Sequence, residues 1–107
     1  MQNPISVAQY SQLKEKQPAH AIVSKTDLVV IRYGEKISVL YGRCLHRGAL
    51  LADGHVDGDN LICGLHNWDF RIDTGVSEYD HKEFLHKFEA KVEGDQVLID
   101  EDEVKSY

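Results

Sequence analysis

The sequence lacks several features that mark large classes of protein. Its 107 residues include only two cysteines and two prolines, Pro4 and Pro18. No apolar run approaches the roughly 20 residues of a membrane-spanning helix, so we expect no membrane segment. The start, Met-Gln-Asn-Pro-Ile-Ser, lacks both the basic region and the apolar core of a secretory signal, which favours a cytoplasmic location.

Basic residues are also scarce. There are 12 lysines and arginines against 18 aspartates and glutamates, which gives a formal net charge of −6. Such an acidic chain is poorly suited to nucleic acids or anionic membranes, and it suits docking to a basic face of a protein partner. The sequence has no internal repeat and no linker, and its length is near that of a common domain. Residues 1–107 are therefore predicted to form one domain.

The two cysteines stand out because each has a histidine within three residues. The first pair is Cys44 and His46, and the second is Cys63 and His66. Two thiolates and two imidazoles are the ligands of a 2Fe-2S centre in which one iron carries both cysteines and the other both histidines. A cysteine and a histidine this close in sequence cannot easily be adjacent ligands of one tetrahedral metal. They can reach two irons of one cluster if the backbone between them curls.

Three other interpretations of the cysteines stay open at this point. A structural zinc site of the Cys2His2 type usually has ligand pairs two to four residues apart, so Cys-x-His is tight for it. A thiol nucleophile with a histidine base would use one pair and leave the other idle. Two unrelated buried cysteines would leave both neighbouring histidines unexplained.

The residues around both pairs carry a family resemblance. Cys-Leu-His-Arg-Gly at 44–48 and Cys-Gly-Leu-His-Asn-Trp-Asp-Phe at 63–70 resemble the cluster loops of ring-hydroxylating oxygenases and soluble Rieske ferredoxins. The resemblance covers roughly residues 20–100. It implies one 2Fe-2S cluster, with Cys44 and Cys63 on the inner iron and His46 and His66 on the outer iron. The implied function is one-electron transfer, with no catalytic site in this chain.

The resemblance leaves the redox partner open. The chain is similar to stand-alone ferredoxins that carry electrons from a flavin reductase to an oxygenase, and also to the N-terminal redox module of a larger oxidoreductase. Residues 43–79 are similar, too, to Rieske modules fused to FMN-dependent glutamate-synthase-like enzymes. The soluble branch of the family fits better than the membrane-anchored branch, whose cluster loops are joined by an additional cysteine pair.

Three departures from the family pattern bear on the chemistry. Trp68 and Phe70 occupy positions where high-potential relatives carry Ser and Tyr hydroxyls, which implies a low potential. The stretch 77–86 lacks the proline of the loop that covers the cluster in many relatives, so it must close differently or leave the cluster more open. It also places Glu78, His81 and His86 at the spacing of a mononuclear iron site, but we interpret these two histidines as ordinary surface residues.

The pattern along the rest of the chain predicts an all-β fold. Ser6 as an N-cap, followed by an apolar stripe, predicts a short helix over residues 6–17. Strands are predicted at 21–23, 28–33, 36–41, 68–72, 90–93 and 96–99, with turns at 34–35, 57–60, 73–75 and 94–95. His20 and His55 are interpreted as solvent-facing loop residues, and the acidic end 101–107 as a solvated tail or a linker. The expected architecture is an antiparallel Rieske fold with a small cluster-binding lobe built from two loop-bearing hairpins.

Overall fold

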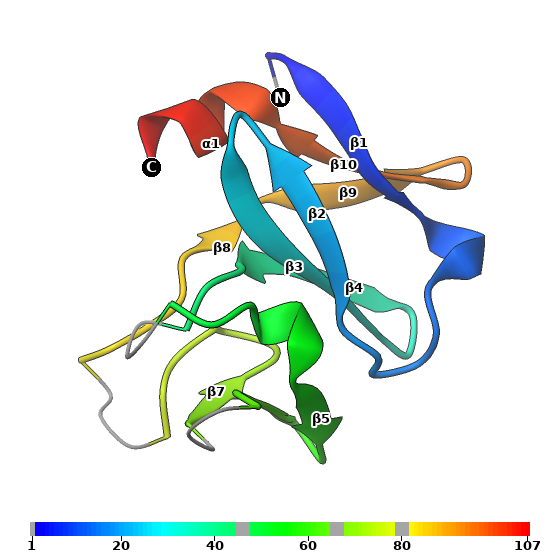
Figure 1. Ribbon diagram of the computed structural model, residues 1–107. Coiled ribbons are helices and arrows are strands. Elements are labelled where there is room, and N and C mark those ends of the chain that lie inside the picture. Colours follow the sequence, from blue (N-terminus) through cyan, green and yellow to red (C-terminus); the bar gives the residue numbers. More distant parts are fainter. Residues whose placement is uncertain (1, 45–47, 65–67, 79–81) are drawn as a thin grey trace.

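The structure is a computed structural model that describes residues 2–44, 48–64, 68–78 and 82–107. Antiparallel strands dominate it (Figure 1). In chain order, the elements are β1 (Pro4–Gln9), a 3-10 turn (Tyr10–Gln12), β2 (Ala19–Val23), β3 (Thr26–Tyr33), β4 (Lys36–Tyr41), a second 3-10 turn (Leu51–Asp53), β5 (His55–Asp57), β6 (Asn60–Ile62), β7 (Asp69–Arg71), β8 (Lys87–Phe88), β9 (Ala90–Glu93), β10 (Gln96–Asp100) and α1 (Glu101–Ser106).

The described strands form three small sheets. Their orders are β1-β10-β9, β2-β3-β4-β8 and β5-β6-β7. Because β8 pairs with β4, residues 42–86 leave the second sheet and return to it as one insertion. We call this insertion the lobe. It lies at one end of the molecule, away from both termini (Figure 1), so the predicted all-β fold with a small inserted lobe is confirmed.

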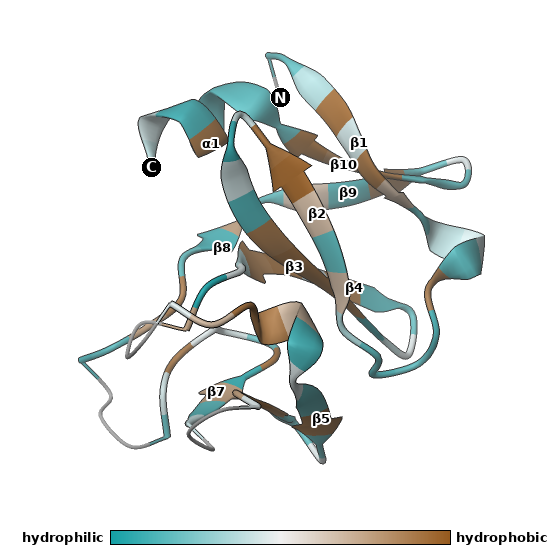
Figure 2. Ribbon diagram, in the orientation of Figure 1, coloured by the Kyte–Doolittle hydropathy of each residue, from teal (hydrophilic) through white to brown (hydrophobic). Residues whose placement is uncertain are grey.

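Strand β3 connects the two halves of the molecule because both of its faces are buried. Side chains alternate across a strand, so Leu28 and Val30 point to one face while Val29 and Ile31 point to the other. The first pair belongs to the sheet core, which consists of Leu13, Val23, Leu28, Val30, Val39, Phe88, Val97, Ile99 and Val104. The second pair belongs to the lobe core, which consists of Val29, Ile31, Leu40, Cys44, Leu51, Leu61, Cys63, Phe70, Ile72 and Leu85. Figure 2 shows the corresponding concentration of apolar residues along β3 and β4.

The predicted helix over residues 6–17 is wrong. Residues Pro4–Gln9 form β1, which pairs with β10 through contacts such as Ile5 with Ile99, and only Tyr10–Gln12 make a helical turn. The hydroxyl of Ser6, expected to cap a helix, bonds to Gln96 on β10 instead. A partner strand about ninety residues away therefore decides the structure of this segment, and the local helical pattern does not.

The C-terminal acidic stretch is neither a solvated tail nor a linker. It forms α1, whose start is capped by the carboxylate of Asp100 accepting from the backbone N–H of Asp102 at 2.9 Å. Three acidic residues occupy its first turn and Lys105 its last, which suits the helix dipole. The buried Val104 anchors it to the sheet core. In the described part of the chain, no helix is long and apolar enough to cross a membrane.

The predicted strands and turns from residue 21 onward are confirmed within a residue or two. The turns at 34–35, 57–60 and 94–95 each join paired antiparallel strands. His20 and His55 lie in β2 and β5 and so are not loop residues, although both are exposed as expected. These hairpins have strong local turn signals, which is why the sequence was sufficient to locate them.

Gly54 lies where two backbone segments of the lobe are too close together for a side chain. A Cβ atom there would overlap the carbonyl oxygen of Ile62 and press on the backbone nitrogen of Gly64. The second 3-10 turn, which follows the first cysteine loop, can therefore pack against the strand that leads to the second cysteine only because residue 54 has no side chain.

We predict that Gly54→Ala lowers the free energy of unfolding by about 3 kcal/mol or more, because backbone atoms on both sides must move. Gly58→Ala is the matched control. Gly58 has a positive φ of 63° but no atoms near the position of a Cβ, so its cost should be about 1 kcal/mol. Urea unfolding followed by circular dichroism measures both variants, and equal costs for the two would contradict this account of Gly54.

Candidate metal centre

The first cysteine loop begins directly after β4 and is closed by backbone hydrogen bonds. The N–H of Cys44 donates to the carbonyl of Ala49 at 2.8 Å, and the N–H of Gly48 donates to the carbonyl of Cys44 at 2.7 Å. Arg43 and Leu50 pair beside them in an isolated antiparallel bridge. Gly48 has a φ of 72°, a left-handed conformation that glycine adopts without strain, and this reverses the chain.

The second cysteine loop repeats this construction. The N–H of Cys63 donates to the carbonyl of Trp68 at 2.9 Å. Both cysteines thus bond to the carbonyl five residues later, and each loop emerges from a pair of antiparallel strands or bridges. The prediction that each loop grows from a hairpin is confirmed, because the β3–β4 hairpin leads into the first loop and the β5–β6 hairpin leads into the second.

Both cysteines are buried in the same apolar cluster. Cys44 is 2% exposed and Cys63 is fully buried, and both belong to the lobe core with Leu51, Leu61 and Phe70. No disulfide joins them. Two buried thiols from two similarly closed loops, shielded by aliphatic and aromatic side chains, form a donor set that fits an iron–sulfur cluster held by cysteine sulfur.

The expected histidine ligands, His46 and His66, lie outside the described residues, as do Arg47 and Leu65. Among the residues that the structure does describe, no three His, Cys, Asp or Glu side chains gather into a possible metal site. The assignment of the four ligands therefore continues to rest on the sequence motif, supported by the placement of the two cysteines.

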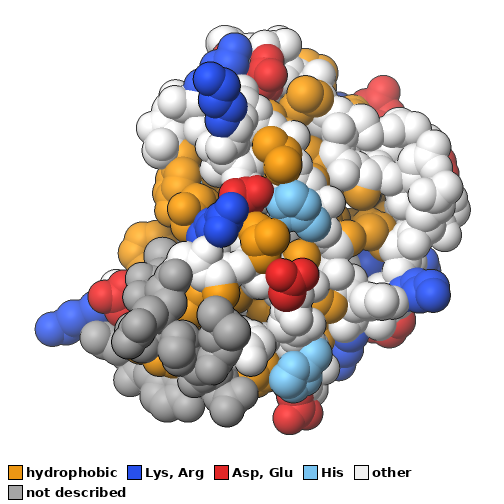
Figure 3. Space-filling model, in the orientation of Figure 1, with side chains coloured by type: hydrophobic (Ala, Val, Ile, Leu, Met, Phe, Trp, Pro, Cys, Tyr) orange, Lys and Arg blue, Asp and Glu red, His pale blue; other side chains and the backbone are white. Residues whose placement is uncertain are grey.

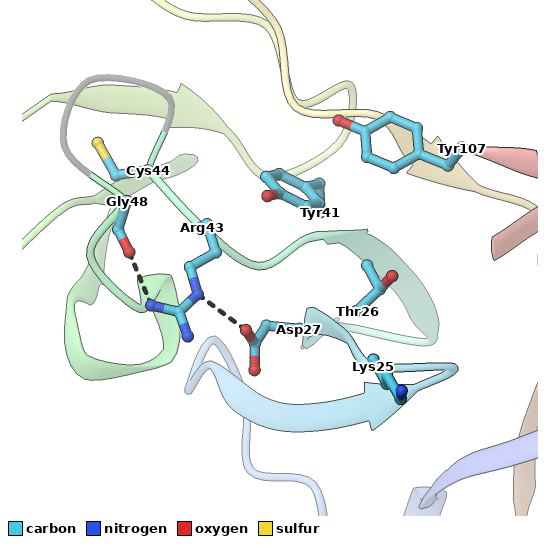
Figure 4. A pocket seen from close by; sticks show the side chains of 8 residues that line it. All are labelled: Lys25, Thr26, Asp27, Tyr41, Arg43, Cys44, Gly48 and Tyr107. Atoms are coloured by element: carbon cyan, nitrogen blue, oxygen red, sulfur yellow. Dashed lines mark hydrogen bonds and ion pairs between the residues drawn. The ribbon is translucent and has the colours of Figure 1, made fainter. Parts of the chain in front are cut away.

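A series of hydrogen-bonded polar side chains outside the motif holds the first loop in place. The guanidinium of Arg43 donates from Nη1 to the carbonyl of Gly48 at 2.9 Å, and from Nε to the carboxylate of Asp27 at 2.8 Å. The second oxygen of Asp27 lies 2.8 Å from Nε2 of His20. Figure 4 shows the guanidinium between Gly48 and Asp27, so the start of β3 is connected to the loop through one side chain.

The charge on Asp27 is stabilised by these partners. Its hydrogen bond with His20, and then that with Arg43, hold the pKa of its carboxyl below the ordinary aspartate value, although partial burial acts in the opposite direction. The backbone carbonyl of Asp27 also accepts from the N–H of Gly42 at 2.8 Å. Sequence reasoning missed Asp27 and His20 because they are distant from the motif, and the only local signal was a basic residue directly before Cys44.

The stretch that follows β7 closes by backbone pairing and without a proline. Isolated bridges join Phe70 with Ser77 and Val76 with Phe84, and the N–H of Leu85 donates to the carbonyl of Gly75 at 2.8 Å. Ser77 is fully buried, while Phe84 is 56% exposed. The described part of residues 77–86 is thus fixed to β7, and the expectation that this stretch closes differently or leaves the cluster more open stays a prediction.

The described residues of the Glu78-His81-His86 spacing have other partners. Glu78 lies 3.6 Å from Arg71, and Nε2 of His86 lies 3.0 Å from Glu103 on α1. The ring of His86 packs against Phe88 with centroids 4.5 Å apart. His81 lies outside the described residues. The interpretation of this spacing therefore stays a prediction.

Comparisons with known proteins agree with this geometry. A family model described as Rieske [2Fe-2S] domain matches residues 3–89. The ferredoxin component of the alkene monooxygenase system of Xanthobacter autotrophicus is 31% identical over 78 residues, covering 72% of this chain and 64% of that protein. The chain spans less than two thirds of the length of the curated relatives it matches, between 12% and 64%.

Solved structures show the same fold. The ferredoxin of carbazole 1,9a-dioxygenase from Nocardioides aromaticivorans superposes with a TM-score of 0.84 at 25% identity, covering 92% of this chain and 97% of that one. A chain in a complex of reduced oxygenase and oxidized ferredoxin of carbazole 1,9a-dioxygenase gives a TM-score of 0.82 at 25% identity, covering 94% and 95%.

We predict that Asp27→Asn lowers the free energy of unfolding at pH 7 by about 1–3 kcal/mol, because two charge-assisted hydrogen bonds are weakened. Since the folded-state pKa of Asp27 is lowered, its contribution is complete above the ordinary aspartate pKa and is lost as the pH falls through the lowered value. The difference between wild type and variant should therefore shrink in acid.

The measurement is urea unfolding at a series of pH values. Asp57→Asn is the matched control, because Asp57 is exposed and makes no ion pair within the described residues. A difference between wild type and Asp27→Asn that persists unchanged in acid would show that the Asp27 charge is not what anchors the loop.

Proposed function

We propose that this chain, which belongs to the Rieske [2Fe-2S] domain family, carries single electrons as the ferredoxin component of an oxygenase system. Its cofactor is one 2Fe-2S cluster, which when bound accepts and releases one electron at a time. In this proposal Cys44 and Cys63 hold the inner iron, and His46 and His66 hold the outer iron.

One observation carries the proposal, namely the matching construction of the two loops around two buried cysteines. Each loop fixes its cysteine by a hydrogen bond to the carbonyl five residues later, and the lobe core excludes water from both thiols. Both features favour electron transfer, because a rigid and shielded site changes little in geometry when its charge changes. In the sequence, the histidines follow the cysteines by two and three residues.

The partner side of the proposal follows the relatives. They include ferredoxin components of a monooxygenase and a dioxygenase, and a ferredoxin in complex with its oxygenase. We infer that this chain accepts electrons from a reductase and passes them to a terminal oxygenase, acting as a single domain over residues 1–107 in the cytoplasm. The FMN-dependent and zinc-stabilised alternatives receive no support from these relatives.

We predict two irons and two acid-labile sulfides per chain in the purified protein, with the red-brown colour of a 2Fe-2S centre. Cys44→Ala or Cys63→Ala should abolish cluster binding, because each removes an anionic ligand to iron. Iron, zinc and sulfide analysis measures the content directly. Stoichiometric zinc without sulfide would refute the proposal.

We predict a midpoint potential in the lower half of the range of about −150 to +300 mV that Rieske centres span. Phe70 is fully buried in the lobe core with both cysteines, yet it carries no hydroxyl that could donate to sulfur. Phe70→Tyr should raise the potential by an amount on the order of tens of millivolts, because a hydrogen bond to sulfur favours the reduced cluster.

Phe88→Tyr is the matched control for this prediction, since Phe88 is equally buried but belongs to the sheet core. It should leave the potential unchanged when measured by protein-film voltammetry. A wild-type potential in the upper half of the range would mean that other donors, such as the indole N–H of Trp68, replace the missing hydroxyl.

A further inference from the structure

A hollow of about 490 Å³ lies beside the first cysteine loop. Three parts of the chain line it: the β2–β3 turn and the start of β3, the end of β4 with the first loop, and the end of α1. The described lining residues are Lys25, Thr26, Asp27, Tyr41, Arg43, Cys44, Gly48 and Tyr107. Because Cys44 and Gly48 belong to this lining, the hollow adjoins the described ends of the first cysteine loop.

Some polar side chains of this hollow have hydrogen-bond or ion-pair partners among the described residues, and others do not. Asp27 and Arg43 are paired with each other, and their remaining bonds go to His20 and Gly48. Within the described part of the chain, by contrast, the side chains of Lys25 and Thr26 have no ion pair or hydrogen bond. The hollow therefore presents an ammonium group and a hydroxyl, both able to donate, while the side-chain carboxylate of Asp27 is already paired with Arg43 and His20.

The aromatic side of the hollow adds neutral donors. The ring centroids of Tyr41, at the end of β4, and Tyr107, directly after α1, lie 5.1 Å apart, and both residues line the hollow (Figure 4). Partial burial, and secondarily Tyr41, raise the pKa of Tyr107, so its hydroxyl stays protonated at neutral pH. The lining thus combines hydroxyl groups and a cation around a space next to the candidate metal centre.

The turn that carries Lys25 has a strained backbone. Ser24 and Lys25 are the two central residues of the β2–β3 hairpin and have φ angles of 50° and 66°. This conformation is adopted most readily by Asn and Gly, and side chains such as those of serine and lysine are strained in it. Strained backbone positions cluster at binding sites, so the turn that carries Lys25 is a candidate for one.

The surface around the hollow is not uniformly acidic despite the net charge of −6. The face in Figure 3 shows basic and acidic side chains interspersed, with hydrophobic side chains along the edge next to the residues that are not described. The nearby Glu101 accepts from Ser24 and pairs with Lys105, and it forms no ion pair with Lys25. The cation at this turn is therefore free to meet a carboxylate from outside the chain.

We propose that this hollow is a docking site for an acidic side chain on the surface of the electron-transfer partner, which Lys25 and Thr26 bind in the space that Cys44 also lines. The proposal rests on the electron-transfer function proposed above. It adds a contact at the hollow and specifies the group that the partner presents there, which is an aspartate or glutamate carboxylate. Charge complementarity selects this occupant, since Lys25 is a cation of the lining with no ion pair within the described residues, and the hydroxyl of Thr26 next to it can donate.

The first test compares two small oxidants of opposite charge in stopped-flow experiments on the dithionite-reduced holoprotein. The reduced cluster loses one electron either to ferricyanide, which becomes ferrocyanide, or to hexaamminecobalt(III), which becomes the cobalt(II) complex. Lys25→Glu should slow the ferricyanide reaction about fivefold at 0.1 M ionic strength and speed the cobalt reaction similarly. The ratio of the two rates cancels any change in the potential of the cluster.

Lys36→Glu is the matched control, with the same change in net charge. Lys36 is exposed, has no ion pair within the described residues, and begins β4, about 17 Å along the strand from Tyr41. Its rate ratio should change less than about twofold. Equal responses of the two variants would overturn the docking site, whereas a protein that takes up no electron from dithionite would refute the proposed function itself.

The second test concerns the carboxylate. A tetraglutamate peptide at constant ionic strength should slow ferricyanide oxidation of the wild type but not of Lys25→Glu, and tetraglutamine should slow neither. Lys25→Gly should be as stable as the wild type or more stable, because glycine relieves the left-handed turn. It should nevertheless lose the tetraglutamate effect. Inhibition that is the same in wild type and in both Lys25 variants would overturn the proposal.

Discussion

The two hydrogen bonds from the cysteine N–H groups to the carbonyls five residues later are the constraint on which the lobe depends. A thiol can be fixed at the mouth of a loop only if the loop reverses within five residues and its ends pair. Gly48 makes that reversal possible in the first loop, and Gly54 lets the connecting turn approach the strand before the second. The lobe core then holds both thiols away from water.

Strand β3 connects the lobe to the rest of the fold. Its two buried faces belong to different cores, so one strand transmits the order of the larger sheets to the cysteine loops. The hydrogen-bonded side chains of His20, Asp27 and Arg43 add directional contacts to this apolar packing. Apolar burial fixes the distance between β3 and the loop, and the guanidinium fixes the orientation of the Gly48 carbonyl.

The sequence was most informative where the controlling interactions are local. The turns at 34–35, 57–60 and 94–95 have residues that favour those conformations, and the Cys-His pairs define their own loops, so hairpins and candidate ligands could be predicted. The N-terminal segment could not, because β1 depends on pairing with β10. Asp27 was missed for the same reason, since its role arises from a contact with Arg43, sixteen residues away in sequence.

The charge of the molecule acts differently at long and short range. At a distance, a net charge of −6 favours partners with a basic surface, and this attraction falls off over a Debye length of about 8–10 Å. At contact, individual groups decide, because a carboxylate within hydrogen-bond reach of Lys25 experiences that ammonium far more strongly than the average field. A partner that is basic overall and carries one acidic side chain at the hollow satisfies both conditions. The long-range field would set how often the two proteins meet, while the hollow beside Cys44 would select the orientation in which an electron can pass.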